Sequence, residues 1–369
     1  MPKLSITPRW SMTDTADDKS AGVTAAYPLQ RIVDLLVQIQ VHGSLAEASR
    51  RTGSSYRNAW ESLRIGERLF GVPLATMTRG RGALLTPLGD LLVWAEHRVA
   101  ARLSPLLDSL GAEINVEIER VLEYGHAALR IRASHGFAVQ TMRDVLLRER
   151  MPVDIRYCSN AKALAALAAD DCELAGLHVP IGVYERPVLA RLAKWLDPDG
   201  QRIVHIANRR LGLRVQKTNP KRIYQLADLA RDDVHFVNRQ NSSGTRYLLE
   251  LLLNDENIDP GRINGYDSEE FTHGAVAAFV ASGMADAAFG VETPARRFGL
   301  HFIPIVTERY FMLGKVATLE RPDLRRILDL LRGPAFREAV NDLPGYDATH
   351  SGTVATIAET FVEWRDASR

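Results

Sequence analysis

Residues 43–60 read GSLAEASRRTGSSYRNAW, and this stretch sets the fold expected for the amino-terminal part of the chain. Ser44 and Glu47 have the S-x-x-E spacing of a capping box, which predicts a helix start. The helix is short and rich in alanine, and Gly53 is expected to end it. Ser54 or Ser55 then caps a second helix. Two short helices joined by a glycine-containing turn are typical of a helix-turn-helix.

The second predicted helix has two faces. Tyr56, Trp60 and Leu63 are spaced to pack against the first helix, and an arginine-rich stripe lies beside them. In such motifs the start of the second helix enters the major groove of DNA, so its first residues are candidates for base contacts. The candidates are Ser54, Ser55, Tyr56, Arg57 and Asn58, with Arg64 and Arg68 as phosphate contacts or partners of Glu61 and Glu67.

Arg79 and Arg81 lie on a glycine-rich turn between two extended segments, which is the composition of a wing. Between Ser44 and Gly82 the chain has seven Arg and three Glu, a local excess of +4. The whole chain carries only +1, so any attraction to nucleic acid has to come from this segment. A three-helix interaction module with a solvated basic face is the alternative interpretation.

Composition limits the remaining classes. The chain has 369 residues, 46% of them hydrophobic and 25% charged, which suits two or three globular domains. Its two cysteines, Cys158 and Cys172, are too few for a disulfide scaffold and lack metal-ligand spacing, so no metal site is expected. No apolar run is long enough for a membrane span or an export signal, so we expect a cytoplasmic protein with no membrane partner.

Thr86 and Pro87 mark the start of a further helix, as an N-cap followed by proline. An apolar seam with steps of three and four residues then resembles that of a coiled coil. The seam consists of Leu88, Leu92, Ala95, Val99, Leu103, Leu106 and Leu110. Pro105 is expected to kink or break this helix, and Gly111 to mark a linker.

From Val121 onward, short apolar segments such as 129–133, 153–157, 203–206, 234–237 and 287–289 alternate with helix-like stretches. This alternation predicts an α/β architecture with largely parallel sheets. Two phrases, ALAALAADDCELAGL (163–177) and AVAAFVASGMADAAFG (275–290), are alike. Their similarity favours two lobes of similar construction with a ligand cleft between them.

Residues 236–246, FVNRQNSSGTR, run from a predicted strand through a polar loop directly into a predicted helix. Free backbone amides and the positive end of the helix point to one place there, which favours an anion site. Arg239 and Arg246 add charge, while a plain strand-to-helix turn capped by serine is the alternative. Similar turns occur at Ala133–Gly136, Cys158–Asn160 and Phe271–Gly274.

The amino-terminal phrases GSLAEASRRTGSSYRNAWESL and TRGRGALLTPLGDLL resemble the DNA-binding domain of ModE-type molybdate-responsive regulators, which is related to LysR-type helix-turn-helix domains. The resemblance covers residues 28–110. It implies a homodimer joined through the helix around Leu88–Leu110, or a higher oligomer such as a tetramer, that binds a palindromic operator in double-stranded DNA.

Three later phrases, NPKRIYQLADLARDDVHFVNRQNSSGTR, THGAVAAFVASGMADAAFGVE and FREAVNDLPGYDA, resemble molybdate-binding-protein-like domains with the type II periplasmic-binding-protein fold. The resemblance covers residues 120–350 and implies two lobes joined by crossing strands near Val204–Val215 and Glu308–Val316. Together with the polar turns, it places ligand contacts on the cleft loops. The candidates are Ser134, His135, Ser159, Asn160, His178, Arg239, Asn241, Ser242, Ser243, Gly244, Thr245, Thr272 and Glu292.

The sequence thus predicts an α+β multidomain chain. Its parts are a tail (1–27), a winged helix-turn-helix (28–86), a linker and dimerisation helix (87–112), a two-lobed sensor (120–350, second lobe about 215–306) and a carboxyl-terminal helix or tail (351–369). The expected function is a transcriptional regulator whose DNA binding responds to a small anion, with no covalent cofactor. Molybdate or tungstate, a carboxylate such as formate, and a pterin remain open as ligands.

An enzyme or cofactor-binding protein is the alternative class, with the helix-turn-helix serving as a protein-interaction module. Neither G-x-S-x-G nor H-E-x-x-H occurs in the chain, so no catalytic residue is expected.

Overall fold

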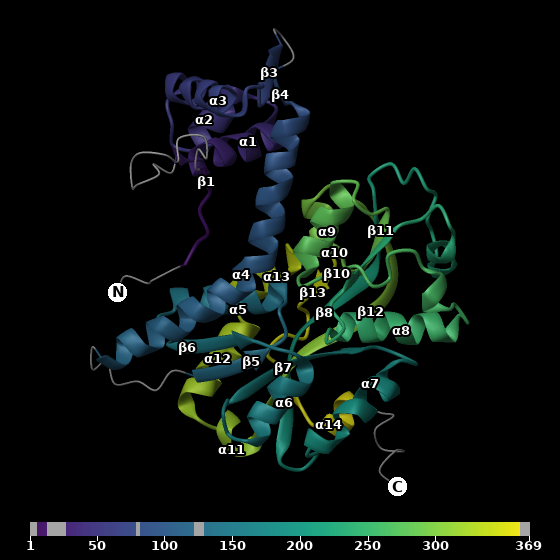
Figure 1. Ribbon diagram of the computed structural model, residues 1–369. Coiled ribbons are helices and arrows are strands. Elements are labelled where there is room, and N and C mark those ends of the chain that lie inside the picture. Colours follow the sequence, from purple (N-terminus) through teal and green to yellow (C-terminus); the bar gives the residue numbers. More distant parts are fainter. Residues whose placement is uncertain (1–5, 13–26, 79–81, 122–128, 362–369) are drawn as a thin grey trace, which may run out of the picture. The chain divides into compact units, whose positions relative to one another are not determined.

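The computed structural model describes residues 6–12, 27–78, 82–121 and 129–361 (Figure 1). The chain divides into two compact units, one within Thr7–Leu103 and the other beginning at Ser104. Among the described residues, no helix combines the length and hydrophobicity needed to cross a membrane.

The described part of the amino-terminal unit is built from three helices, two two-stranded sheets and the start of a fourth helix. Its elements are β1 (Ser11–Met12), β2 (Tyr27–Pro28), α1 (Gln30–His42), α2 (Leu45–Arg51), α3 (Tyr56–Phe70), β3 (Ala75–Thr78), β4 (Gly82–Leu85) and the start of α4 (Pro87–Val121). Strand β1 pairs with β2, so part of the expected tail is ordered. The amide of Leu29 donates to the carbonyl of Trp10 at 3.0 Å, and the Trp10 indole donates to Glu96.

The core of this unit lies mainly on α1, where Ile32, Leu36 and Ile39 are buried. Helix α3 joins it through Ala59 and Leu63. The expectation that Tyr56 and Trp60 pack inward is wrong, because Tyr56 is 52% exposed and Trp60 is 39% exposed. Small Ala59 allows α3 to approach closely, and it turns the neighbouring aromatic residues toward solvent.

The β3–β4 hairpin is attached to the end of α1. Gly43 ends α1 with φ 62°, a left-handed conformation that favours glycine. Its carbonyl accepts a hydrogen bond from the amide of Ala83 at 2.8 Å. A Cβ atom on Gly82 would lie 2.2 Å from that same oxygen, so the close approach requires glycine there too.

Helix α4 is continuous from Pro87 to Val121. The helix therefore does not break at Pro105, and the linker expected at Gly111 is helical instead, while the kink expected at Pro105 stays a prediction. A single proline removes one intrahelical hydrogen bond, and a glycine costs about 1 kcal/mol relative to alanine. The leucines, alanines and charged residues on either side favour helix strongly enough to outweigh both.

The second unit contains one ten-stranded sheet, which belongs to two lobes. Its main strand order is β10-β9-β11-β8-β12-β7-β5-β6, and β13 and β14 also pair with β8. The strands are β5 (Leu129–Ala133), β6 (Val153–Tyr157), β7 (Leu174–Pro180), β8 (Gln201–Val215), β9 (Phe236–Arg239), β10 (Glu269–Glu270), β11 (Ala287–Val291), β12 (His301–Lys315), β13 (Tyr346–Asp347) and β14 (Val354–Ala355).

Strands β8 and β12 pair antiparallel along their whole length and pass through both lobes. The first lobe contains the parallel strands β6, β5 and β7, and β7 pairs with residues 308–314 of β12. The second lobe contains β10, β9 and β11, and β11 pairs with residues 211–215 of β8. Register shifts in β12 after Pro304 and Tyr310 flank the crossing between the lobes.

Helices cover both lobes (Figure 1). They are α5 (Phe137–Arg148), α6 (Asn160–Ala168), α7 (Glu185–Leu192), α8 (Gly244–Asp255), α9 (His273–Ala281), α10 (Glu292–Arg297), α11 (Val316–Leu319), α12 (Pro322–Arg332), α13 (Pro334–Asn341) and α14 (Ile357–Thr360), with short 3-10 helices at Ala193–Trp195, Leu226–Ala230 and Pro260–Arg262. After β12 the chain returns to the first lobe, where α12 and α13 pack against α5. The predicted two-lobed α/β architecture is confirmed.

Candidate functional site

Three arginine side chains are buried where the two lobes meet. Arg209 is 1% exposed and Arg214 is 0% exposed, and both lie on β8. Arg239, at the end of β9, is 8% exposed. Guanidinium groups stay charged in proteins, and a buried charge is expensive unless it is paired. The partners of these three groups therefore indicate what the site is built to hold.

Arg209 has a carboxylate partner. Its register partner on β12 is Glu308, which is 1% exposed, and Arg209 Nη2 lies 2.7 Å from Glu308 Oε2. The guanidinium group also lies 5.5 Å from the centre of the Tyr310 ring. Burial alone disfavours the charge, but Glu308 more than offsets it and raises the pKa of Arg209 above its ordinary value.

Arg214 and Arg239 have hydrogen bonds only to neutral groups among the described residues. Arg214 Nη1 donates to the carbonyl of His273 at 2.7 Å, and Arg239 Nη1 donates to the carbonyl of Glu270 at 3.4 Å. Their Nε atoms are buried without a hydrogen-bond partner in the described part of the chain. Burial, followed by repulsion between arginines, lowers the pKa of each to about 9.

Three histidines surround these arginines and are held neutral. Burial lowers the pKa of His178 to about 4, and burial with repulsion from Arg239 lowers that of His273 far below its usual value. Burial and repulsion from Arg239 also lower the pKa of His135, to about 3. A neutral imidazole can donate from one ring nitrogen and accept at the other, so these rings add hydrogen-bonding capacity without charge.

His178 connects the two lobes. It lies on β7, and its Nδ1 is 3.0 Å from the hydroxyl of Ser134. Its Nε2 is buried without a partner among the described residues and faces the start of α8 in the second lobe. A Cβ atom on Gly244 would lie 2.5 Å from this nitrogen, so only glycine allows the approach.

Helix starts add backbone donors to the same region. Ser243 caps α8 and Thr272 caps α9, accepting from Thr245 and Ala275 respectively. Helix α5 has no side-chain cap at Gly136, and a Cβ there would lie 3.6 Å from Arg209 Nη1. Uncapped amides at a helix start attract anions. The cluster formed by Arg209, Arg214 and Arg239 contains two buried carboxylates among the described residues, Glu270 and Glu308. Three arginines and two carboxylates leave a surplus of one positive charge.

The predicted ligand contacts divide into three groups. Ser134, His135, His178, Arg239, Gly244 and Thr272 lie at this cluster or bond directly to it. Asn160 donates to the carbonyl of His178 at 3.2 Å, Ser159 caps α6, and Ser243 and Thr245 serve the start of α8. Asn241 and Ser242 are exposed beside them.

Two sequence assignments differ from the structure. The Glu292 carboxylate is 2.7 Å from Arg210 and 3.0 Å from Arg296, both half exposed, so it is already neutralised by surface arginines. Arg246 pairs with Glu269 at 2.7 Å and lies over the Tyr266 ring, so it does not join the cluster. Arg210 and Glu269 are distant in sequence from the residues they pair with, whereas Arg296 lies one helical turn from Glu292.

Several members of the cluster are not among the ligand residues predicted from the sequence. They are Arg209, Arg214, Glu270, His273, Glu308 and Tyr310. One signal was available, because Arg209 and Arg214 interrupt an apolar segment that was expected to be a crossing strand. A charged residue inside such a segment is a candidate for a buried functional group.

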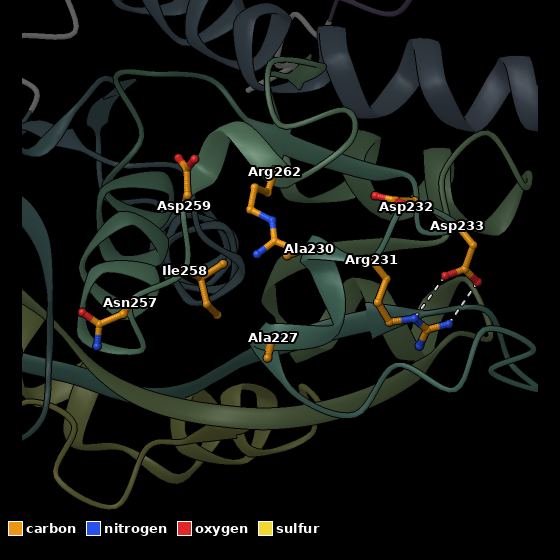
Figure 2. A pocket seen from close by; sticks show the side chains of 9 residues that line it. All are labelled: Ala227, Ala230, Arg231, Asp232, Asp233, Asn257, Ile258, Asp259 and Arg262. Atoms are coloured by element: carbon orange, nitrogen blue, oxygen red, sulfur yellow. Dashed lines mark hydrogen bonds and ion pairs between the residues drawn. The ribbon is translucent and has the colours of Figure 1, made fainter.

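A separate pocket of about 640 Å³ lies on the outside of the second lobe. Figure 2 shows the guanidinium group of Arg231 turned toward Asp233, and the two are 3.0 Å apart. The lining also includes Asp259, whose carboxylate caps Gly261. Arg231 and Asp233 neutralise each other, and none of the predicted ligand residues lines this pocket.

Neither cysteine has the environment of a nucleophile. Burial raises the pKa of Cys158, and it raises that of Cys172 to about 11. Both thiols are therefore less reactive than an ordinary cysteine at neutral pH. Within the described residues, no group of three or more His, Cys, Asp or Glu side chains is arranged to hold a metal ion.

The amino-terminal unit carries the residues predicted to contact DNA. Ser44 accepts from the amide of Glu47 at 3.4 Å, but the Glu47 carboxylate pairs with Arg50 and Arg51, so the expected capping box is only half formed. Ser55 caps α3, and its neighbours Arg57, Asn58 and Arg64 are exposed. Arg68 pairs with Glu61 at 3.1 Å. Arg79 and Arg81 lie outside the described residues.

A family model described as PBP superfamily domain matches residues 146–332. The uncharacterized protein YvgK from Bacillus subtilis (strain 168) is 30% identical over 210 residues, 56% of this chain and 65% of YvgK. Molybdenum-pterin-binding protein MopB from Rhodobacter capsulatus is 28% identical over 172 residues, 40% of this chain and 63% of MopB. The chain thus spans less than two thirds of each.

Among solved structures, a mutant of OxyR from Corynebacterium glutamicum with bound hydrogen peroxide matches with a TM-score of 0.44 and 16% identity. The match covers 85% of this chain and 94% of the OxyR chain.

Proposed function

Because the chain belongs to the PBP superfamily through residues 146–332, we propose that it is a transcriptional regulator whose two lobes bind a small anion and thereby control DNA binding. The observation that carries the proposal is the buried surplus of positive charge on Arg209, Arg214 and Arg239. An anion between the lobes would neutralise this surplus and occupy the partnerless Nε donors. Contacts from both lobes would also favour their closed arrangement.

The chemistry of the donors suggests a small oxyanion. Guanidinium groups, backbone amides and neutral imidazoles suit a compact group with several oxygen atoms. Molybdate and tungstate fit this description, and the similarity to the molybdenum-pterin-binding protein MopB supports a molybdenum-containing ligand. Formate would use the same arginines, and a pterin would need more room. The experiment below separates these ligands.

The DNA-binding half of the proposal rests on α2, α3 and the β3–β4 hairpin. Their order matches a winged helix-turn-helix, in which α3 would lie in the major groove and the hairpin beside it. Ser54, Ser55, Tyr56, Arg57 and Asn58 are at the start of α3, as base contacts require. The hydrogen bond from Ala83 to Gly43 holds the hairpin against this part of the unit.

We place a homodimer contact on α4. Leu103, Leu110, Ile114 and Ile118 are 37–41% exposed on this helix. Their spacings of seven, four and four residues put them along one side, as in a coiled-coil seam. A second copy of the helix would cover them, so that two α3 helices reach two half-sites of an operator. Ligand-induced lobe closure would act on the DNA through this helix.

The decisive experiment selects duplexes from a random DNA library with the full-length protein. Affinity for the selected duplex is then measured by fluorescence anisotropy with molybdate, tungstate, sulfate, formate or a pterin. Sodium chloride at equal ionic strength is the control, because DNA binding depends strongly on salt. We expect one anion to change the affinity at least fivefold beyond the salt control. Failure to enrich any sequence would refute DNA recognition, and no specific anion effect would refute sensing.

A further inference from the structure

Two aromatic side chains are exposed together on α3. Tyr56 is 52% exposed and Trp60 is 39% exposed, although their one-turn spacing suggested a buried pair. Trp60 Nε1 donates to the Tyr56 hydroxyl at 2.9 Å, which fixes the two rings relative to each other. Large aromatic side chains left in water usually mark a contact surface.

The hydrogen bond determines what this surface can recognise. An indole has one polar atom, its N–H donor, and in Trp60 that donor is already used. Trp60 therefore offers only hydrocarbon and the face of its ring. It has nothing left with which to contact a phosphate oxygen or the polar edge of a base.

Charge on the same side of the helix indicates the partner. At about 100° per residue, Tyr56, Trp60, Arg64 and Arg57 fall within an arc of about 100°. Arg57 and Arg64 are exposed. The apolar surface formed by Tyr56 and Trp60 is bordered by exposed arginines. Such a surface complements a polyanion that also presents apolar groups. In the DNA major groove the only such group is the C5 methyl of thymine.

We propose that the Tyr56–Trp60 pair reads thymine methyl groups in the operator and so determines specificity at A·T positions. The inference rests on the proposed DNA-binding function and deepens it. Arg57 and Asn58 would read polar base edges, while the aromatic pair would add contacts that depend on a single methyl group.

Replacing individual thymines by deoxyuridine tests this directly, because it removes the methyl and leaves the base-pairing edge unchanged. The duplex is one selected from a random library by the full-length protein. Each thymine in a half-site is replaced in turn, and affinity is measured at fixed salt. We expect one or two positions at which the wild type loses about fourfold in affinity, the value for one buried methyl group. Trp60→Ala should bind both duplexes equally at those positions.

Leu69→Ala is the matched control, since Leu69 is 37% exposed on the same helix but about 180° from Trp60. It should keep the wild-type response to deoxyuridine. Tyr56→Ala provides a second variant in case Trp60→Ala fails to fold. If the wild type ignores every replacement, or if Trp60→Ala keeps the full response, the proposal is wrong while DNA recognition stands. If Trp60→Ala changes the oligomeric state but still loses affinity when thymine is replaced by deoxyuridine, the Tyr56–Trp60 surface is a protein contact instead.

Discussion

Arg239 and Arg246 allow a paired test of the proposed anion site. They lie seven residues apart at the same loop, but their guanidinium groups have different partners. Arg239 is buried beside neutral carbonyls, whereas Arg246 is buried against Glu269 at 2.7 Å. We predict that Arg239→Met stabilises the ligand-free protein and abolishes its response to the anion. Arg246→Met should destabilise the protein and leave that response in place.

The magnitude follows from the pKa of Arg239. A pKa lowered to about 9 means that folding disfavours the charged guanidinium by about 5 kcal/mol relative to water. The attraction of Glu270 is already included in this value, so the net effect of the charge is unfavourable. Some of it will be lost to relaxation, and replacing buried charges by apolar side chains stabilises proteins by about 1–4 kcal/mol. We expect about 2 kcal/mol, or a Tm about 6 °C higher.

The Arg246 control should move the other way. Removing one partner of a buried ion pair costs about 3 kcal/mol, and Glu269 is partly exposed, so about 2 kcal/mol is expected. Both variants and the wild type are compared by thermal unfolding, with and without the anion that stabilises the wild type most. Two results would refute the reasoning: a ligand-free Arg239→Met that is less stable than the wild type, or one that retains the full ligand-induced shift.

Three further predictions concern other groups at the two sites. Burial lowers the folded-state pKa values of His135, His178, His205 and His273, so the unfolded chain takes up protons first as pH falls below about 6.5. Each of these histidines should lower the unfolding free energy in urea by about 1.2 kcal/mol between pH 7 and 5.5, about 5 kcal/mol in all, and His178→Gln should show a drop that is smaller by about 1.2 kcal/mol. An equal drop in the variant would contradict this assignment. Gly244→Ala places a Cβ 2.5 Å from His178 Nε2 and should weaken anion binding at least tenfold by calorimetry, whereas unchanged affinity would move the site elsewhere. Arg57→Ala should reduce binding to the selected operator by about 1–3 kcal/mol with little effect on random DNA, and equal losses on both would make Arg57 a phosphate contact.

Local patterns in the sequence predicted most of the second unit. The segments 129–133 and 153–157 are β5 and β6 with the same bounds, and the segment 287–289 lies within β11. These elements are recognisable because each apolar run is bounded by residues that end it, such as Gly136 or Asp170. The polar turns before α8 and α9 were recognisable for the same reason.

The charged cluster could not be predicted in this way, because it depends on pairings between distant segments. Arg209 meets Glu308 across 99 residues, through the register of β8 with β12. Glu292 looked equivalent to a ligand residue at a strand end, yet Arg210 and Arg296 neutralise it. Arg296, four residues after Glu292, is a local sign of that pairing, whereas the partner of Glu308 is set only by the register of β8 with β12.

The error on α3 has a different cause. Tyr56, Trp60 and Leu63 share helical spacing, and the pattern alone favours burying the largest side chains. The core selects Ala59 and Leu63, because α3 must lie close to α1 and a small residue permits that distance. The side of α3 that faces the core is therefore offset by one residue from the predicted side, and the two aromatic residues lie on the surface.

The sharing of β8 and β12 by both lobes has a consequence for how the chain acquires its structure during synthesis. The first lobe needs residues 308–314 to complete its sheet, although all its other central strands precede residue 216. The second lobe needs residues 301–304 of the same strand beside β8. Neither sheet can close until the ribosome has released β12. We therefore expect the nascent two-lobed unit to remain protease-sensitive until late in translation and then to fold in one cooperative step.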